Sequence, residues 1–83
     1  MDSVADNDTR ALVDRIARIW CEVLDIPQVG IADNFFDLGG TSFQLLLVKN
    51  RLDSELATAT ELVGFFRHPT VAALAEHVYG KAL

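Results

Sequence analysis

Apolar residues recur at helical spacing along most of this 83-residue chain, and this periodicity restricts it to a fold built of helices. The first pattern predicts a helix that begins at a cap formed by Asp8 or Thr9 and runs to about Leu24. Residues 1–8 are mostly polar and are expected to be frayed. The face that we expect to be buried carries Leu12, Ile16, Ile19 and Val23, with Trp20 and Leu24 widening it.

Three further helices are predicted after a break in the pattern. They cover residues 42–52, 61–66 and 71–80, with Thr60 and Thr70 as the N-terminal caps of the last two. In the last helix the residues spaced for burial are Val71, Leu74, Ala75 and Val78. This order of helix lengths predicts an all-α fold, a small helical bundle of three main helices plus one short accessory helix.

A long loop, residues 25–41, separates the first two helices. Pro27 stops the first helix and Gly30 is a second breaker, while Gly39 and Gly40 permit backbone conformations that other residues avoid. A short strand is the alternative for this stretch, and its glycines and proline argue against it. A loop of this length is usually functional or tied down. The side chains that we expect to tie it to the core are Ile26, Val29, Ile31, Phe35, Phe36 and Leu38.

The composition indicates one small acidic domain, residues 1–83, structured from about residue 10 to residue 80. A net charge of −5 makes nucleic acid and anionic membranes poor partners. No apolar stretch reaches the length needed to cross a bilayer, and no signal peptide is visible. The single cysteine, Cys21, cannot form an internal disulfide, so we expect an inert core residue in a reducing cytoplasm.

One hydroxyl, that of Ser42, follows the two-glycine turn at the start of the second helix. A serine there ordinarily caps the helix by accepting a hydrogen bond from a free amide of the first turn. As a nucleophile it would need an adjacent base, and His68 and His77 sit in no recognisable catalytic pattern. We expect both histidines to be solvated or helix-terminal. Without an adjacent base for Ser42, we predict no catalytic residues. We also predict no metal site, because no cluster of Cys, His and carboxylates has metal-ligand spacing.

The second helix carries more apolar residues than one buried face requires. At about 100° per residue, Leu45, Val48 and Leu52 share the core face. The residues that point away from the core, alongside Ser42, are Phe43, Leu46 and Leu47. An exposed apolar patch there is typical of a docking surface, and Lys49 could fix the orientation of a partner. The alternative is that the long loop or the third helix covers some of these side chains.

Two stretches resemble one known family. Residues 33–42, Asp-Asn-Phe-Phe-Asp-Leu-Gly-Gly-Thr-Ser, are similar to the attachment site of thiolation domains, the peptidyl carrier proteins of nonribosomal peptide synthesis. Residues 65–75, Phe-Phe-Arg-His-Pro-Thr-Val-Ala-Ala-Leu-Ala, look like the end signature of the same family. The resemblance implies that Ser42 carries a covalent 4′-phosphopantetheine arm from coenzyme A, on an attachment turn formed by Gly39, Gly40 and Thr41.

The resemblance further implies a carrier that performs no catalysis itself and holds aminoacyl or peptidyl intermediates as thioesters on that arm. Such a carrier would be a cytoplasmic monomer of secondary metabolism and antibiotic biosynthesis. Its implied partners are a phosphopantetheinyl transferase, an adenylation enzyme or domain, and condensation, thioesterase or tailoring enzymes.

Two other interpretations stay open at this point. An acyl carrier for polyketide-type or aryl units has the same chemistry, although such carriers usually place Asp just before the serine, where this chain has Thr41. In peptidyl relatives the same position is frequently His, Asp or Asn, so Thr41 departs from that pattern too. The interpretation from another class is a non-catalytic helical protein-interaction module whose Ser42 is only a cap. The sequence is equally compatible with a free-standing protein and with a domain of a larger synthetase.

Overall fold

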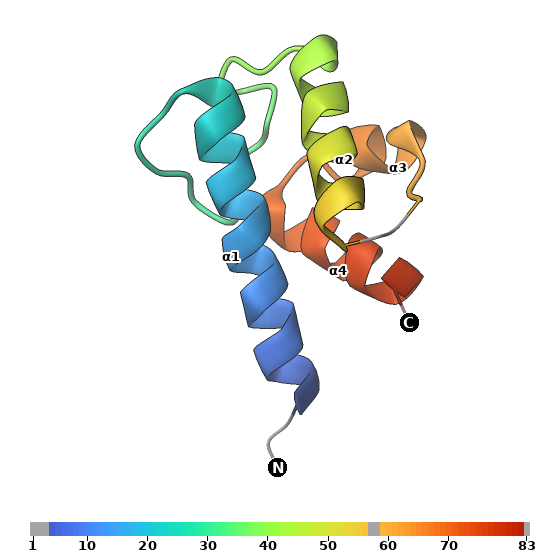
Figure 1. The fold of residues 1–83 in the computed structure, drawn as a ribbon. Helices are drawn as coiled ribbons and strands as arrows, with labels where there is room; N and C mark the ends of the chain where they lie inside the picture. Colours follow the sequence, from blue (N-terminus) through green and yellow to red (C-terminus); the bar gives the residue numbers. More distant parts are fainter. Residues whose placement is uncertain (1–3, 57–58, 83) are drawn as a thin grey trace.

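The computed structural model describes residues 4–56 and 59–82 of the chain. Four α-helices lie within them: α1 (Val4–Leu24), α2 (Ser42–Leu56), α3 (Leu62–Arg67) and α4 (Val71–Ala82). α1 contacts α2 and α4, and α3 contacts the same two helices. The C-terminal end of α1 and the N-terminal end of α2 lie at the same end of the molecule, where the loop 25–41 joins them (Figure 1). The predicted all-α bundle with a long first loop and a short accessory helix is confirmed.

The hydrophobic core forms where the apolar faces of the helices meet the loop. The predicted face of α1 is buried, although Val23 and Leu24 at its end are only partly covered. In α2 and α4 every residue expected in the core is inaccessible to solvent. The buried apolar residues are Leu12, Ile16, Ile19, Trp20, Phe35, Leu45, Val48, Leu52, Phe65, Val71, Leu74, Ala75 and Val78. None of the described helices is both long and apolar enough to span a membrane.

α1 ends where the sequence predicted but begins earlier. After Leu24, Asp25 adopts a left-handed backbone conformation (φ 58°), and the amide of Ile26 donates to the carbonyl oxygen of Cys21 at 3.0 Å. This bond closes the helix before Pro27 is reached. The helix begins at Val4, so residues 4–8 are helical and the expected start at Asp8 or Thr9 is wrong. No glycine or proline interrupts residues 4–8, so the sequence permits the longer helix.

α2 continues to Leu56, past the predicted end near Leu52. The polar residues Asp53, Ser54 and Glu55, which lie beyond the predicted end, form the last turn of the helix. Lys49 and Asp53, one turn apart, make an ion pair of 2.9 Å, and both side chains are mostly covered. Leu56 packs against the core, so this last turn also buries apolar surface.

Thr60 does not cap α3 as predicted. Its hydroxyl donates to Oδ1 of Asp53 at 2.8 Å and its amide donates to the same oxygen at 3.1 Å, in a largely buried position. Glu61 therefore takes the cap position without a side-chain hydrogen bond, and α3 spans Leu62–Arg67. The other predicted cap is confirmed, because Oγ1 of Thr70 accepts from the amide of Ala73 at 3.2 Å. α4 then runs slightly past the expected end near Gly80.

The ring of Phe35 anchors the long loop. It is completely buried and makes an edge-to-face contact with the indole of Trp20, at 4.9 Å between ring centroids. The Phe35 amide donates to the carbonyl oxygen of Pro69 at 2.7 Å, next to a single antiparallel β-bridge between Asn34 and Thr70. These contacts fasten the loop both to α1 and to the junction of α3 and α4.

The other loop residues that we expected to contact the core differ in whether and how they do so. The partly buried side chains that pack against the core are Val29, Phe36 and Leu38. The ring of Phe36 stacks on that of Phe66 at 5.8 Å between centroids. Ile31 was expected to tie the loop through its side chain, and this is wrong because that side chain is 55% exposed. Its carbonyl oxygen instead accepts from the amide of Ala72 at 3.0 Å, so the backbone makes the tie.

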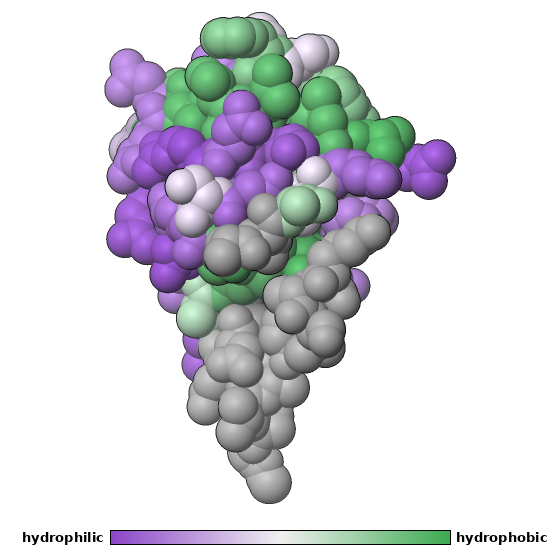
Figure 2. All heavy atoms as spheres, turned by 45° about the vertical axis from the view of Figure 1, so that its right-hand side comes forward, coloured by the Kyte–Doolittle hydropathy of each residue, from purple (hydrophilic) through white to green (hydrophobic). Residues whose placement is uncertain are grey.

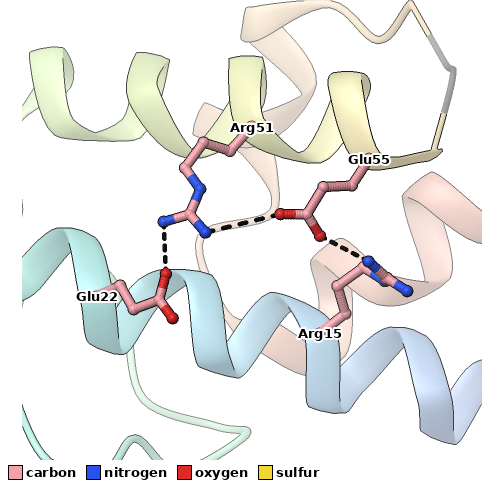
Figure 3. A network of polar contacts seen from close by, with 4 residues as sticks. All are labelled: Arg15, Glu22, Arg51 and Glu55. Carbon is pink, nitrogen blue, oxygen red and sulfur yellow. Dashed lines mark hydrogen bonds and ion pairs between the residues drawn. The ribbon is translucent and has the colours of Figure 1, made fainter.

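Four charged side chains connect α1 with α2 (Figure 3). Arg15 contacts Glu55 at 2.6 Å, while Arg51 contacts Glu22 at 2.7 Å and Glu55 at 3.6 Å. Glu55 thus accepts a hydrogen bond from Arg15 of α1 and forms a longer ion pair with Arg51 of its own helix. The hydrogen bond from Arg15 is the main reason that the pKa of Glu55 is lowered from its ordinary value, and the charges of Arg15 and Arg51 act in the same direction.

We expect this network to make stability depend on pH in the acid range. Because folding lowers the pKa of Glu55, its contribution to stability is present above the ordinary glutamate pKa of about 4.3 and is lost as the pH falls further. Urea unfolding of wild type and Glu55→Gln should give separate midpoints at neutral pH that converge in acid. Glu76→Gln changes an exposed glutamate of α4 and should match wild type throughout. A midpoint difference for Glu55→Gln that is independent of pH would contradict this prediction.

The two loop phenylalanines should differ in their effect on stability. Phe35→Ala removes a fully buried ring and should lower the free energy of unfolding by about 3–5 kcal/mol. Phe36→Ala should cost clearly less, because that ring is only partly buried. Thermal or urea unfolding of the two variants measures the difference. Equal midpoints for both variants would show that Phe35 does not anchor the loop.

Candidate functional site

A hydrogen-bonded turn brings the loop back to the start of α2. Oδ1 of Asn34 accepts from the amides of Phe36 and Asp37 at 2.8 and 3.2 Å. The amide of Leu38 donates to the carbonyl oxygen of Asn34 at 3.1 Å, and that of Gly40 donates to Phe35 at the same distance. An asparagine that bonds the backbone two and three residues on is a common way to set such a turn. The turn holds the residues before α2 against the buried ring of Phe35.

The two glycines of this turn serve different purposes. Gly39 has a φ of +96°, a conformation that residues with a Cβ rarely adopt. Gly40 is needed for space, since a Cβ there would lie 2.3 Å from Cε2 of Phe35 and 2.8 Å from its carbonyl oxygen. The expected special backbone is therefore present at Gly39, while Gly40 allows the chain to pass directly over the ring.

Thr41, not Ser42, caps α2. The carbonyl oxygen of Thr41 accepts from the amide of Leu45 at 2.9 Å, and its Oγ1 accepts from the amide of Gln44 at 3.1 Å. In return the side-chain oxygen of Gln44 accepts from the amide of Thr41 at 3.0 Å. This reciprocal pair is a capping box, and the Thr-x-x-Gln spacing in the sequence is its signature. The capping role expected for Ser42 is thus wrong, because its neighbour already fills it.

Ser42 is left with an exposed side chain at the first position of α2. Within the part of the chain that the structure describes, its hydroxyl makes no hydrogen bond. The N-terminus of a helix presents free amides and a positive dipole end, both of which favour a phosphate group. An accessible hydroxyl in this position fits the attachment of a phosphodiester.

Apolar side chains surround this end of the molecule. Phe43 is 68% exposed and Leu47 is 38% exposed, whereas Leu46 is half-buried. Val63 and Phe66 of α3 are also exposed, and the spacing of apolar residues predicted exposure for neither of them. Figure 2 shows hydrophobic residues gathered over the end at which α2 begins, above a hydrophilic band. Lys49, expected to orient a partner, lies further along α2 in its ion pair with Asp53.

The two histidines contact each other. The rings of His68, the C-cap of α3, and His77 stack at 4.7 Å between centroids. His77 also lies against Gly64, where a Cβ would come within 2.4 Å of Nε2. His68 is helix-terminal as expected, but His77 is half-buried between α3 and α4, not solvated. Cys21, expected in the core, is half-buried on α1.

Comparisons with known proteins agree on one family. Residues 14–78 match the model of the phosphopantetheine attachment site. The chain is 39% identical over 74 residues, 89% of its length, to tyrocidine synthase 3 of Brevibacillus parabrevis, of which it spans 1%. It is 38% identical over 72 residues, 87% of its length, to gramicidin S synthase 2 of Brevibacillus brevis, of which it spans 2%. The chain thus corresponds to a small part of these large synthases.

Two solved structures extend the likeness to the fold. BlmI, a type-II acyl carrier protein of Streptomyces verticillus involved in bleomycin biosynthesis, is 29% identical with a TM-score of 0.92 over 95% of both chains. A peptidyl carrier protein solved with the phosphopantetheine transferase Sfp and coenzyme A is 33% identical, with a TM-score of 0.79 over 83% of this chain and 90% of that one. This chain therefore belongs to the phosphopantetheine attachment-site family, whose members are non-catalytic carrier domains with 4′-phosphopantetheine as their cofactor.

Proposed function

We propose that Ser42 is the attachment point of 4′-phosphopantetheine and that the domain carries aminoacyl or peptidyl units in nonribosomal peptide synthesis. The observation that carries the proposal is the exposed hydroxyl of Ser42, which is free of hydrogen bonds within the described residues and sits on the turn Gly39, Gly40 and Thr41 at the start of α2. The attachment-site model spans this turn. The large synthases among its relatives support the peptidyl assignment.

The chain contributes an acceptor, and the partner enzyme contributes the catalysis. Oγ of Ser42 forms a bond to the pantetheine-bearing phosphorus of coenzyme A as the diphosphate P–O bond breaks and adenosine 3′,5′-bisphosphate leaves. The serine proton passes to a base of the transferase, because no base of this chain is bonded to Ser42 in the described residues. When bound, the group supplies a terminal thiol that holds an acyl unit as a thioester. The free amides at the start of α2 favour the phosphodiester charge.

The partners follow from this chemistry. We infer a phosphopantetheinyl transferase, an adenylation enzyme or domain, and condensation, thioesterase or tailoring enzymes, in the cytoplasm. The unpaired Cys21 is consistent with a reducing compartment. A second candidate, an acyl carrier for polyketide-type or aryl units, is favoured by the full-length likeness to BlmI. Mass analysis of the loaded thioester separates the two candidates.

Partner enzymes should dock on the apolar surface beside Ser42. Phe43 and Leu47 are exposed on the face of α2 that the core does not use, and such contiguous apolar surface is typical of interaction sites. Leu46 lies at its edge, half-buried. Lys49 would act only after release from Asp53, so we give it a smaller part in orienting partners.

The attachment is tested with Ser42→Ala. Incubation with coenzyme A and a broad-specificity phosphopantetheinyl transferase should add one phosphopantetheine to the wild type and none to the variant, read by intact-protein mass. Because Thr41 and not Ser42 caps α2, the variant should keep the thermal stability of wild type within about 0.5 kcal/mol. Thr41→Ser keeps the cap and the attachment serine, so it should be modified. A mass gain that persists in Ser42→Ala would place the site elsewhere, and no gain in wild type would favour a plain interaction module.

The docking surface is tested with Phe43→Asn. The residue is 68% exposed, so the free energy of unfolding should change by less than about 1 kcal/mol. Loss of an apolar anchor should slow processing by at least one partner by about tenfold or more. Ile31→Asn is the matched control, because Ile31 is similarly exposed but lies in the loop beside the start of α4. Equal processing rates for wild type and Phe43→Asn with every partner would show that the surface is not used.

A further inference from the structure

The side chain of Gln44 joins α1 to the start of α2. It is half-buried in the first turn of α2, where its oxygen accepts from the amide of Thr41 at 3.0 Å. Its amide nitrogen also donates to the carbonyl oxygen of Val23, in the last turn of α1, over a long contact of 3.4 Å. That carbonyl is one of the last four of its helix, which have no partner inside the helix. A single side chain thus satisfies one orphan group at each helix end.

Only a side-chain amide can both accept the hydrogen bond from Thr41 and donate one to Val23. Glutamate, the other usual partner in a capping box, would accept from Thr41 but could not donate to Val23. Its charge would also face a carbonyl oxygen. Methionine would fill the volume and make neither bond. Gln44 is therefore the residue that couples the capping box to the neighbouring helix.

We propose that Gln44 is a positioning residue for Ser42, setting the direction in which the hydroxyl and then the arm leave the domain. This inference rests on the proposed attachment at Ser42. Gly40 over Phe35 fixes the chain just before the helix, and the capping box fixes its first turn to Thr41. Neither contact is a hydrogen bond to α1, although the ring of Phe35 packs on Trp20 in the middle of that helix. Leu45 holds the inner side of that first turn in the core, whereas the bond from Gln44 to Val23 ties the first turn to the C-terminal end of α1. Loss of this bond should therefore let the outer side of the turn, which carries Ser42, shift relative to α1.

The test is steady-state transfer from coenzyme A by a broad-specificity phosphopantetheinyl transferase, with the apo protein as the varied substrate. Gln44→Glu keeps the capping box but loses the bond to α1, and its kcat should fall about three- to tenfold, the range expected for one hydrogen bond, with KM little changed. Gln44→Met loses both bonds and should be slower still. Since Met is neutral, its slowing would not be a charge effect. Asn50→Asp makes the same amide-to-acid change at an exposed site of α2 and should match wild type.

The split between kcat and KM separates positioning from stability. A variant that is only less stable presents less folded substrate, which raises the apparent KM and leaves kcat unchanged. Wild-type kcat in both Gln44 variants, or a change in KM alone, would overturn the inference while the attachment at Ser42 stands. If wild type gains no group at Ser42, the proposed function fails first, and the inference fails with it. A fall in kcat confined to the Gln44 variants supports it.

Discussion

The burial of one ring, that of Phe35, holds the functional end of this domain in place. The ring contacts Trp20 of α1, and its own backbone pairs with the junction between α3 and α4. Gly40 passes so close over it that no larger residue would fit. The ring contact, the backbone pairing and the close approach of Gly40 together remove most of the loop's conformational freedom, although the loop has little regular secondary structure. The position of Ser42 therefore depends on contacts that reach residues far from it in the sequence.

At the start of α2, Thr41 caps the helix and the neighbouring Ser42 presents a hydroxyl to solvent. Thr41 satisfies the free amide of Gln44, so the helix is capped without the use of Ser42. A serine that capped its own helix would lose this bond, or at least its geometry, when its oxygen became part of a phosphodiester. With Thr41 in that role, conversion of the hydroxyl changes no hydrogen bond that the described residues make. If Ser42 is the attachment point, as we propose, the apo and modified forms can share one fold.

The sequence predicted the periodic parts of this structure well and the polar contacts poorly. Apolar spacing correctly identified the buried residues of α2 and α4, because side-chain burial follows directly from helical geometry. Thr60 was misassigned as a cap, and the capping role considered for Ser42 belongs to Thr41. In each case a competing bond decided the outcome, to Asp53 for Thr60 and between Thr41 and Gln44 beside Ser42. The first bond joins two separate segments, so spacing could not reveal it, whereas the second was visible as a capping-box pattern.

α2 can carry exposed apolar residues because contacts on its other faces already fix it to the rest of the bundle. Leu45, Val48 and Leu52 bury one side of the helix, and Arg51 and Glu55 pair with α1 further round. Phe43 takes no part in these contacts, since 68% of its surface faces solvent. A large exposed ring next to an accessible hydroxyl lowers solubility without stabilising the fold. The exposed position of Phe43 is explained if partner enzymes must recognise the surface around Ser42 and then release it. Binding and release of a partner at Phe43 would leave the packing of the bundle unchanged, because the ring is not part of the core.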